Sequence, residues 1–261
     1  MGKLPASTGW LWIKQGYGMF KQQPGNLTSL AMLYAMLNLL LNIVPYIGPL
    51  AWVILTPVFS VALIQAGADV EQGKRVTPKL LTVGFQKPAF GKLVAVGLLY
   101  MAAAALAIGL ATLASDGMLI KLLTGQVPHN SPEARDASLG GAFLVIMAAG
   151  IPAAMAFCFA APLIYFQKMG VGKSIFFSFF GVWRAFKTFA VFLISMFGLM
   201  LLLSQTVALL FGRTPALYMM VMQVVLVLFS VLFHCSLYAS YRQIFGSPVQ
   251  PQDPQENQPQ E

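Results

Sequence analysis

The stretch "VGLLYMAAAALAIGLATLA", Val96 to Ala114, decides the fold class of this 261-residue chain. It carries no charged side chain, and a helical span across a hydrocarbon core about 30 Å thick needs roughly 20 apolar residues. A membrane β-strand would instead alternate apolar and polar side chains over about ten residues, and this stretch does not alternate. It therefore predicts a transmembrane α-helix.

Five other segments share this character. The six predicted spans lie at about residues 27–44, 50–66, 93–114, 139–166, 189–211 and 216–241. Apolar residues make up 58% of the chain and charged residues only 9%, whereas about a quarter of the residues in soluble domains are charged. None of the spans has Lys, Arg, Asp or Glu in its interior, where each would cost about 2.5 to 3.5 kcal/mol. The sequence predicts an all-α integral membrane protein.

The spans pair into three hairpins, and each hairpin follows a basic, aromatic segment. These segments are "WLWIKQGYGMFKQQPG" (10–25), "KLLTVGFQKPAFGK" (79–92) and "KSIFFSFFGVWRAFKTF" (173–189). The first hairpin is expected to turn at "VPYIGP", because proline ends a helix. Pro152 and Pro162 are expected to kink the fourth span. We predict an interfacial amphipathic segment on the cytoplasmic side before each hairpin.

Basic residues gather on one side of the predicted spans. Thirteen of the 16 Lys and Arg residues lie on that side: Lys3, Lys14, Lys21, Lys74, Arg75, Lys79, Lys87, Lys92, Lys168, Lys173, Arg184, Lys187 and Arg242. Cytoplasmic loops carry an excess of these residues, so both termini are predicted to be cytoplasmic. The formal net charge of +8 then favours attraction to anionic lipid headgroups, and no nucleic-acid partner is expected.

Residues 9–24 carry a clear interfacial pattern. On a helical wheel, aromatic residues occupy one half and lysines the other, which is typical of a helix that lies in the membrane interface. The pattern lacks the apolar core of 7 to 15 residues that a signal peptide has. The predicted membrane-interface residues are Trp10, Trp12, Lys14, Tyr17, Phe20, Lys21, Trp183, Arg184 and Lys187.

Few polar side chains lie within the predicted spans. Asn38 and Asn42 are four residues apart, so they share a helix face and form the candidate intramembrane polar site. Hydrogen bonds between helices are the commoner use of such residues, and a solute site is the alternative. Cys158 and Cys235 are expected to act as small apolar side chains. No catalytic, cofactor-binding or metal residues are predicted.

Residues 1–246 are predicted to form a single polytopic membrane domain. The outer loop 115–138 contains "GQVPHNSPEARD" and is expected to form a short helix and a flexible link. The tail 247–261 is rich in proline and glutamine, and it has no large apolar residue after Val249. It is predicted to be a disordered cytoplasmic tail, because it cannot bury enough surface to fold.

The chain resembles a known family. Its pattern is Trp12-x3-Gly16-x3-Phe20-x3-Pro24, followed by "VPYIGP" and "LTPVFSVALIQAGADVEQGKRVTP". This pattern is similar to that of uncharacterised proteobacterial six-span inner-membrane proteins, which are distantly similar to the membrane domains of glycerophosphodiester phosphodiesterases. The resemblance implies a multi-pass protein of the bacterial inner membrane. It implies no activity and no site residues.

The leading functional hypothesis is a non-enzymatic inner-membrane protein that organises lipid or assists another membrane complex. It rests on abundant interfacial sequence without a catalytic constellation. The alternative is a small transporter or permease for a solute or lipid, using Asn38 and Asn42. A membrane-embedded enzyme ranks third. Expected partners are membrane lipids, including anionic headgroups, and a membrane protein or a second copy of the chain.

Overall fold

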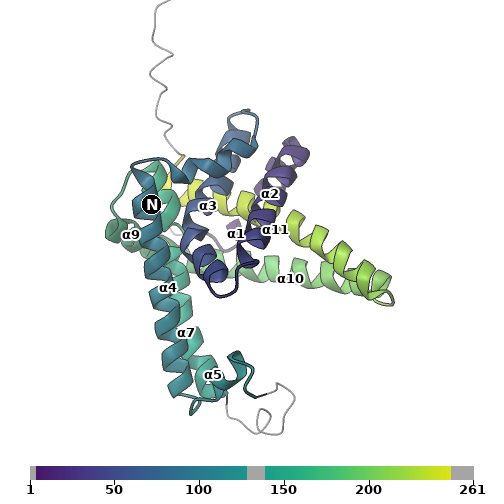
Figure 1. Ribbon diagram of the computed structural model, residues 1–261. Helices are drawn as coiled ribbons and strands as arrows, with labels where there is room; N and C mark the ends of the chain where they lie inside the picture. Colours follow the sequence, from purple (N-terminus) through teal and green to yellow (C-terminus); the bar gives the residue numbers. More distant parts are fainter. Residues whose placement is uncertain (1–3, 128–138, 248–261) are drawn as a thin grey trace, which may run out of the picture.

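The computed structural model describes residues 4–127 and 139–247, and all regular structure in these ranges is helical (Figure 1). The elements are α1 (Thr8–Gln22), α2 (Pro24–Asn42), α3 (Ile47–Glu71), the 3-10 helix η1 (Pro78–Phe85), α4 (Ala89–Leu113), α5 (Met118–Leu123), α7 (Gly140–Phe157), α8 (Ala160–Phe166), α9 (Val171–Arg184), α10 (Phe186–Phe211) and α11 (Pro215–Phe245). Within these two ranges, six helical segments are long and apolar enough to cross a membrane, with α7 and α8 together forming one of them. The prediction of an all-α integral membrane protein is confirmed.

The six segments form three hairpins, namely α2–α3, α4–α7 with α8, and α10–α11. A shorter helix precedes each hairpin: α1 before the first, η1 before the second and α9 before the third. The α4–α7 pair and the α10–α11 pair point away from a common centre in different directions (Figure 1). The first of these pairs packs on α3, α8 and α9, whereas the second packs on α1, α2 and α3. We call these two pairs the arms.

The helices extend beyond the predicted spans at one end of the molecule. The second span was predicted to end at residue 66, but α3 continues to Glu71, and α11 continues past residue 241 to Phe245. Polar residues near these helix ends interrupt the apolar runs, which is why the sequence prediction stopped early. In the structure they remain helical, and some of them contact one another across the two helices.

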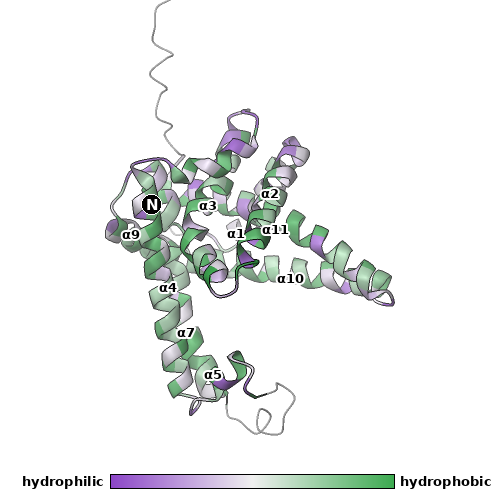
Figure 2. Ribbon diagram, viewed as in Figure 1, coloured by the Kyte–Doolittle hydropathy of each residue, from purple (hydrophilic) through white to green (hydrophobic). Residues whose placement is uncertain are grey.

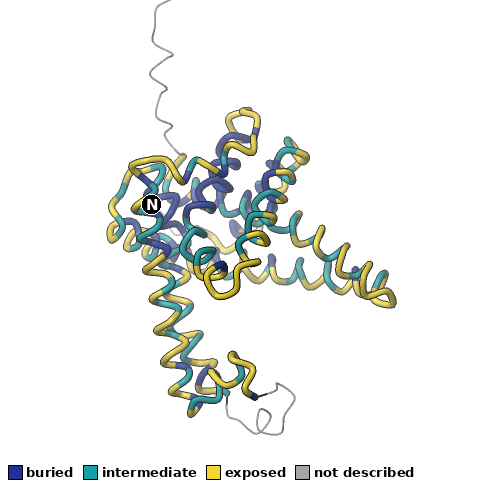
Figure 3. The backbone as a smooth tube through the Cα atoms, viewed as in Figure 1, coloured by how far each residue is buried: buried dark blue, intermediate teal, exposed yellow. Residues whose placement is uncertain are grey.

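Buried side chains concentrate at the end where the three hairpins meet. This end comprises the C-terminal halves of α3 and α11, the first turns of α4, and α1, η1, α8 and α9, and we call it the basic end. Figure 3 shows the buried residues gathered there, while the arms are mostly half-buried or exposed. The largest fully buried side chains are Trp12, Tyr238, Tyr241, Phe159 and Phe192. The basic end is therefore the packed core of the molecule.

The far halves of the hairpins expose large apolar side chains. Leu113 at the end of α4 is 76% exposed, and Leu209 near the end of α10 is 86% exposed. Figure 2 shows apolar residues along the arms, with polar residues mainly at helix ends and in connections. A soluble monomer rarely exposes more than a few hundred Å² of contiguous apolar surface. The arms are suited to lipid, where apolar exposure carries no penalty.

Helix α1 approaches α11 very closely. Gly16 is buried, and a Cβ atom placed on it would lie 2.7 Å from the backbone nitrogen of Ser236. Gly18, two residues later on the same helix, is exposed and has no atom within 4 Å of such a Cβ. Only the first of these glycines is required by packing.

We predict that Gly16→Ala destabilises the protein and that Gly18→Ala does not. The added methyl group at residue 16 must displace the α11 backbone, and overpacking of this kind costs about 1 to 3 kcal/mol. At residue 18 the same change removes the helix penalty of glycine, about 1 kcal/mol, without a clash. The measurement is the thermal unfolding midpoint of both purified variants in one detergent, where equal midpoints would contradict the prediction.

Candidate membrane-interface site

Helix α9 faces the protein with its serines and the outside with its aromatic residues. Ser174, Ser178 and Val182 are buried at four-residue intervals. The exposed side chains are Phe176, Phe177, Phe180 and Trp183, of which Trp183 is 61% exposed. A helix on the surface of a soluble protein has the opposite arrangement, with its apolar stripe toward the core. The pattern of α9 fits a helix whose outer face contacts lipid.

Ser178 joins α9 to a break in the fourth span. The span is interrupted at Cys158 and Phe159, between α7 and α8. The Phe159 N–H donates a hydrogen bond of 2.9 Å to Ser178 Oγ, and this hydroxyl donates one of 2.8 Å to the Met155 carbonyl. A single buried hydroxyl thus satisfies two backbone groups that the break leaves free, as a low-dielectric environment requires.

The position of this break follows from Pro162. Proline lacks an N–H, and its ring clashes with the carbonyl four residues earlier, here that of Cys158. The helix therefore stops at Phe157 and restarts at Ala160. Pro152, where the sequence analysis also predicts a kink, lies inside α7.

Two cations at the end of α9 remain exposed. Arg184 occupies the last turn of the helix, where a positive charge is favourable against the helix dipole, and Lys187 follows in the first turn of α10. Neither forms an ion pair within residues 4–127 and 139–247. Trp183, Arg184 and Lys187 were predicted as interface residues, and all three are exposed at the basic end.

A half-open cavity of about 1150 Å³ lies between α9 and the end of α11. Its lining includes Phe176, Phe177 and Phe180 from α9, and Gln243 and Phe245 from α11. A second cavity of about 370 Å³ adjoins it and includes Lys187. Trp183 and Arg184 line both cavities. We call the two cavities together the aromatic groove.

Helix α1 forms part of the core as well as of the surface. Trp10 is 47% exposed, Tyr17 is 50% exposed with the Lys21 ammonium 4.7 Å from its ring centroid, and Phe20 is half-buried. Lys14 is exposed. These positions are compatible with the predicted interface.

Trp12 departs from the predicted lipid-facing position. It is fully buried, its ring centroid lies 5.1 Å from that of Phe189, and its Nε1–H donates a hydrogen bond of 2.5 Å to Gln243 Oε1. The helical wheel grouped Trp12 with the lipid-facing aromatics because hydropathy does not distinguish a protein core from lipid. Its indole N–H requires a polar partner, which Gln243 supplies.

Asn38 and Asn42 contact each other near the far end of α2. The Asn42 side-chain amide donates to the Asn38 backbone carbonyl at 2.8 Å and to Asn38 Oδ1 at 2.5 Å. Asn42 is exposed, and neither residue lines the two cavities of the aromatic groove. The predicted sharing of one helix face is therefore present, and these two hydrogen bonds stay within α2.

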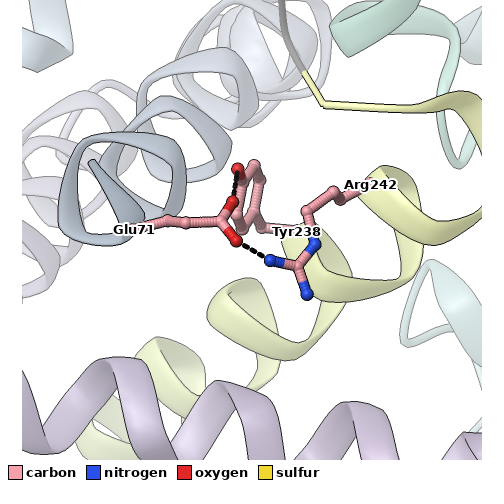
Figure 4. A network of polar contacts seen from close by, with 3 residues as sticks. All are labelled: Glu71, Tyr238 and Arg242. Atoms are coloured by element: carbon pink, nitrogen blue, oxygen red, sulfur yellow. Dashed lines mark hydrogen bonds and ion pairs between the residues drawn. The ribbon is translucent and has the colours of Figure 1, made fainter.

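A polar network that the sequence prediction missed joins α3 to α11 (Figure 4). Glu71 forms an ion pair with Arg242 and accepts a 2.5 Å hydrogen bond from the hydroxyl of Tyr238, whose side chain is buried. Within α3, the Gln65 side-chain amide donates a 2.7 Å hydrogen bond to the carboxylate of Asp69, which is also buried. The prediction placed Asp69 and Glu71 in a connection outside the spans, and α3 includes both.

These structural features together define a class of protein. Six apolar helical segments, outward aromatic residues on α9 and a core gathered at one end are the features of a multi-pass integral membrane protein. A probable inner membrane protein of Burkholderia thailandensis is 31% identical to this chain over 254 residues, which cover 94% of this chain and 93% of the relative. The chain belongs to the family of this protein, and it is a multi-pass protein of the inner membrane. No family model and no solved structure matches the chain.

We predict that Ser178→Ala destabilises the protein by about 1 to 3 kcal/mol, because it leaves the Phe159 N–H and the Met155 carbonyl without a partner in a dry environment. The matched control is Ser204→Ala, since Ser204 is in α10 and donates only to a carbonyl of its own helix. This control is expected to change stability by less than about 0.5 kcal/mol. Denaturant unfolding of the two variants in one detergent measures the difference, and similar stabilities would argue against the bridging role of Ser178.

Proposed function

We propose that the protein is a non-enzymatic component of the inner membrane that assists another membrane complex. The observation that carries the proposal is that several polar side chains near or within its spans, those of Ser178, Glu71 and His234, make contacts within the protein. Ser178 bridges two backbone groups, and Glu71 joins two helices. The Nδ1 atom of His234 lies 2.7 Å from the backbone carbonyl oxygen of Ser230 in its own helix. The contacts of Ser178 and Glu71 join different helices, which favours an architectural role.

The arms support the accessory part of the proposal. They leave the packed basic end in different directions and carry exposed, uncharged side chains along their far halves (Figures 1 and 2). Transmembrane helices associate through van der Waals packing, often over small residues. Helix α4 contains the run Ala102–Ala105, and α7 contains Gly150 and Ala154, so both helices allow close approach of a neighbouring helix.

A transporter is the alternative, and the contact between Asn38 and Asn42 is the observation that favours it. A transporter needs polar side chains at membrane depth that exchange their partners for a solute. These two amides are paired with each other near the exposed end of α2, where a solute could compete for them. This alternative predicts that replacing both with leucine abolishes transport in proteoliposomes.

We also infer that both termini lie in the cytoplasm. The helix ends that meet at the basic end carry most of the cations, including Lys79 in η1 and Lys92 in α4. Lys121 in α5 lies beyond the opposite end of α4. An excess of Lys and Arg marks the cytoplasmic side of a membrane protein.

The orientation predicts which introduced cysteines a membrane-impermeant maleimide can label. Cys158 is half-buried and Cys235 is buried, and both lie within spanning segments, so the background from native thiols should be low. In spheroplasts with an intact inner membrane, Lys121→Cys should be labelled and Lys79→Cys should be labelled only after the membrane is permeabilised. Labelling of Lys79→Cys in intact spheroplasts would reverse the orientation.

The accessory role predicts a protein neighbour in contact with an arm. A photo-crosslinking amino acid at Leu209 or Leu113 should form one reproducible protein adduct in native membranes, because both side chains are largely exposed. The same probe at Val231, which is only 4% exposed, is the control and should form no such adduct.

Two results would contradict this role. Adducts with lipid alone at both exposed positions would exclude a protein neighbour at these arm tips. Solute movement by the purified protein in liposomes, lost in the Asn38→Leu/Asn42→Leu variant, would favour the transporter.

A further inference from the structure

The aromatic groove combines an apolar wall with an exposed cationic end. Phe176, Phe177 and Phe180 project from α9 along the larger cavity, and Phe245 from α11 lines it as well. Gly181 allows this approach, because a Cβ atom on it would lie 2.5 Å from the end of the Phe245 ring. The wall is therefore built from two helices that are distant in the sequence, and it is not merely one exposed helix face.

The cationic end lies where the two cavities meet. Arg184 lines both cavities, and Lys187 lines the smaller one. Because neither has an ion-pair partner in the part of the chain that the structure describes, their charges are available to an anion. A planar guanidinium suits a phosphate oxygen pair, and a nearby ammonium adds a second positive charge.

We propose that the aromatic groove is a binding site for one anionic glycerophospholipid. The phosphate contacts Arg184 and Lys187, and the upper part of an acyl chain lies along Phe176, Phe177 and Phe180. Charge complementarity selects the anionic headgroup, and the apolar wall selects an amphiphile over a free anion. The larger cavity, at about 1150 Å³, exceeds the roughly 300 to 1,000 Å³ of small-molecule sites, so it has room for part of a lipid.

The surroundings of the groove fit this occupant. Trp183 is adjacent to Arg184 and lines both cavities, and tryptophan favours the headgroup level of a membrane because its ring is apolar and its N–H is polar. Lys173 extends the positive charge along α9, with its ammonium 5.9 Å from the ring centroid of Phe177. The inference adds a ligand site and does not depend on the accessory role proposed above.

The test uses the full-length protein in a neutral detergent and phosphatidylglycerol with brominated acyl chains, which quench nearby tryptophan fluorescence. The difference between the wild type and Trp183→Phe isolates the signal of Trp183. We expect brominated phosphatidylglycerol to quench Trp183 at about thirtyfold lower concentration than brominated phosphatidylcholine, because each of the two cations adds about 1 kcal/mol toward an anionic lipid.

Two charge-matched double variants localise the effect. Arg184→Gln/Lys187→Gln should lose the preference for phosphatidylglycerol. Arg75→Gln/Lys79→Gln removes the same charges from exposed residues of the basic end that do not line the groove, and it should keep the preference. All four positions are exposed, and unchanged thermal midpoints would show that both variants fold.

Three results would overturn the proposal. Equal quenching by the two lipids would remove the headgroup preference, and equal loss in both double variants would reduce it to general surface charge. Displacement of the brominated lipid by inorganic phosphate, but not by chloride of equal ionic strength, would identify a free-anion site. Because no partner protein is present in this assay, its failure would leave the accessory role untouched.

Discussion

The close packing of α1 against α11 is the contact on which the rest of the structure depends. Gly16 lets the two helices meet at backbone distance, and Trp12 fills the space beside them with a hydrogen bond to Gln243. Helix α11 in turn holds α3 through the contacts of Tyr238 and Arg242 with Glu71. Each of these contacts lies at the basic end, so the three hairpins are joined at one end and are free of one another along their far halves.

The membrane environment explains why α9 turns its serines toward the protein and its phenylalanines outward. In water, the phenylalanines of α9 would turn inward and Ser178 outward, because apolar burial drives folding. At a membrane the outer face of α9 contacts lipid, so its apolar side chains gain little by turning inward. The greater cost is then an unsatisfied backbone group, and a small hydroxyl that satisfies two of them takes the buried position. The aromatic residues occupy the remaining face.

The all-helical class and the hairpin pairing could be predicted because long apolar runs and proline turns are local signals. The buried position of Trp12 could not be predicted, because a helical wheel does not distinguish a lipid-facing side chain from one in the protein core. The break between α7 and α8 was predicted only as a kink near Pro162, because Ser178, which stabilises it, belongs to another helix. The Glu71–Arg242 ion pair joins residues far apart in the sequence. Taken alone, each charged residue is typical of a loop, so the pair could not be predicted. The aromatic groove was anticipated only through the interface residues Trp183, Arg184 and Lys187.

The separation between a packed base and long arms has a mechanical consequence. Helix α4 has 25 residues, so at a rise of 1.5 Å per residue it is about 37 Å long. The first turns of α4 belong to the packed core, where the helix contacts α3, α8, α9 and η1, and its last turns lead to α5. By this geometry, a rotation of about 5° at the base moves the tip by about 3 Å. Moved as a rigid body, the α4–α7 arm would act as a lever that turns a slight shift beside Ser178 into a displacement of atomic size at its far tip.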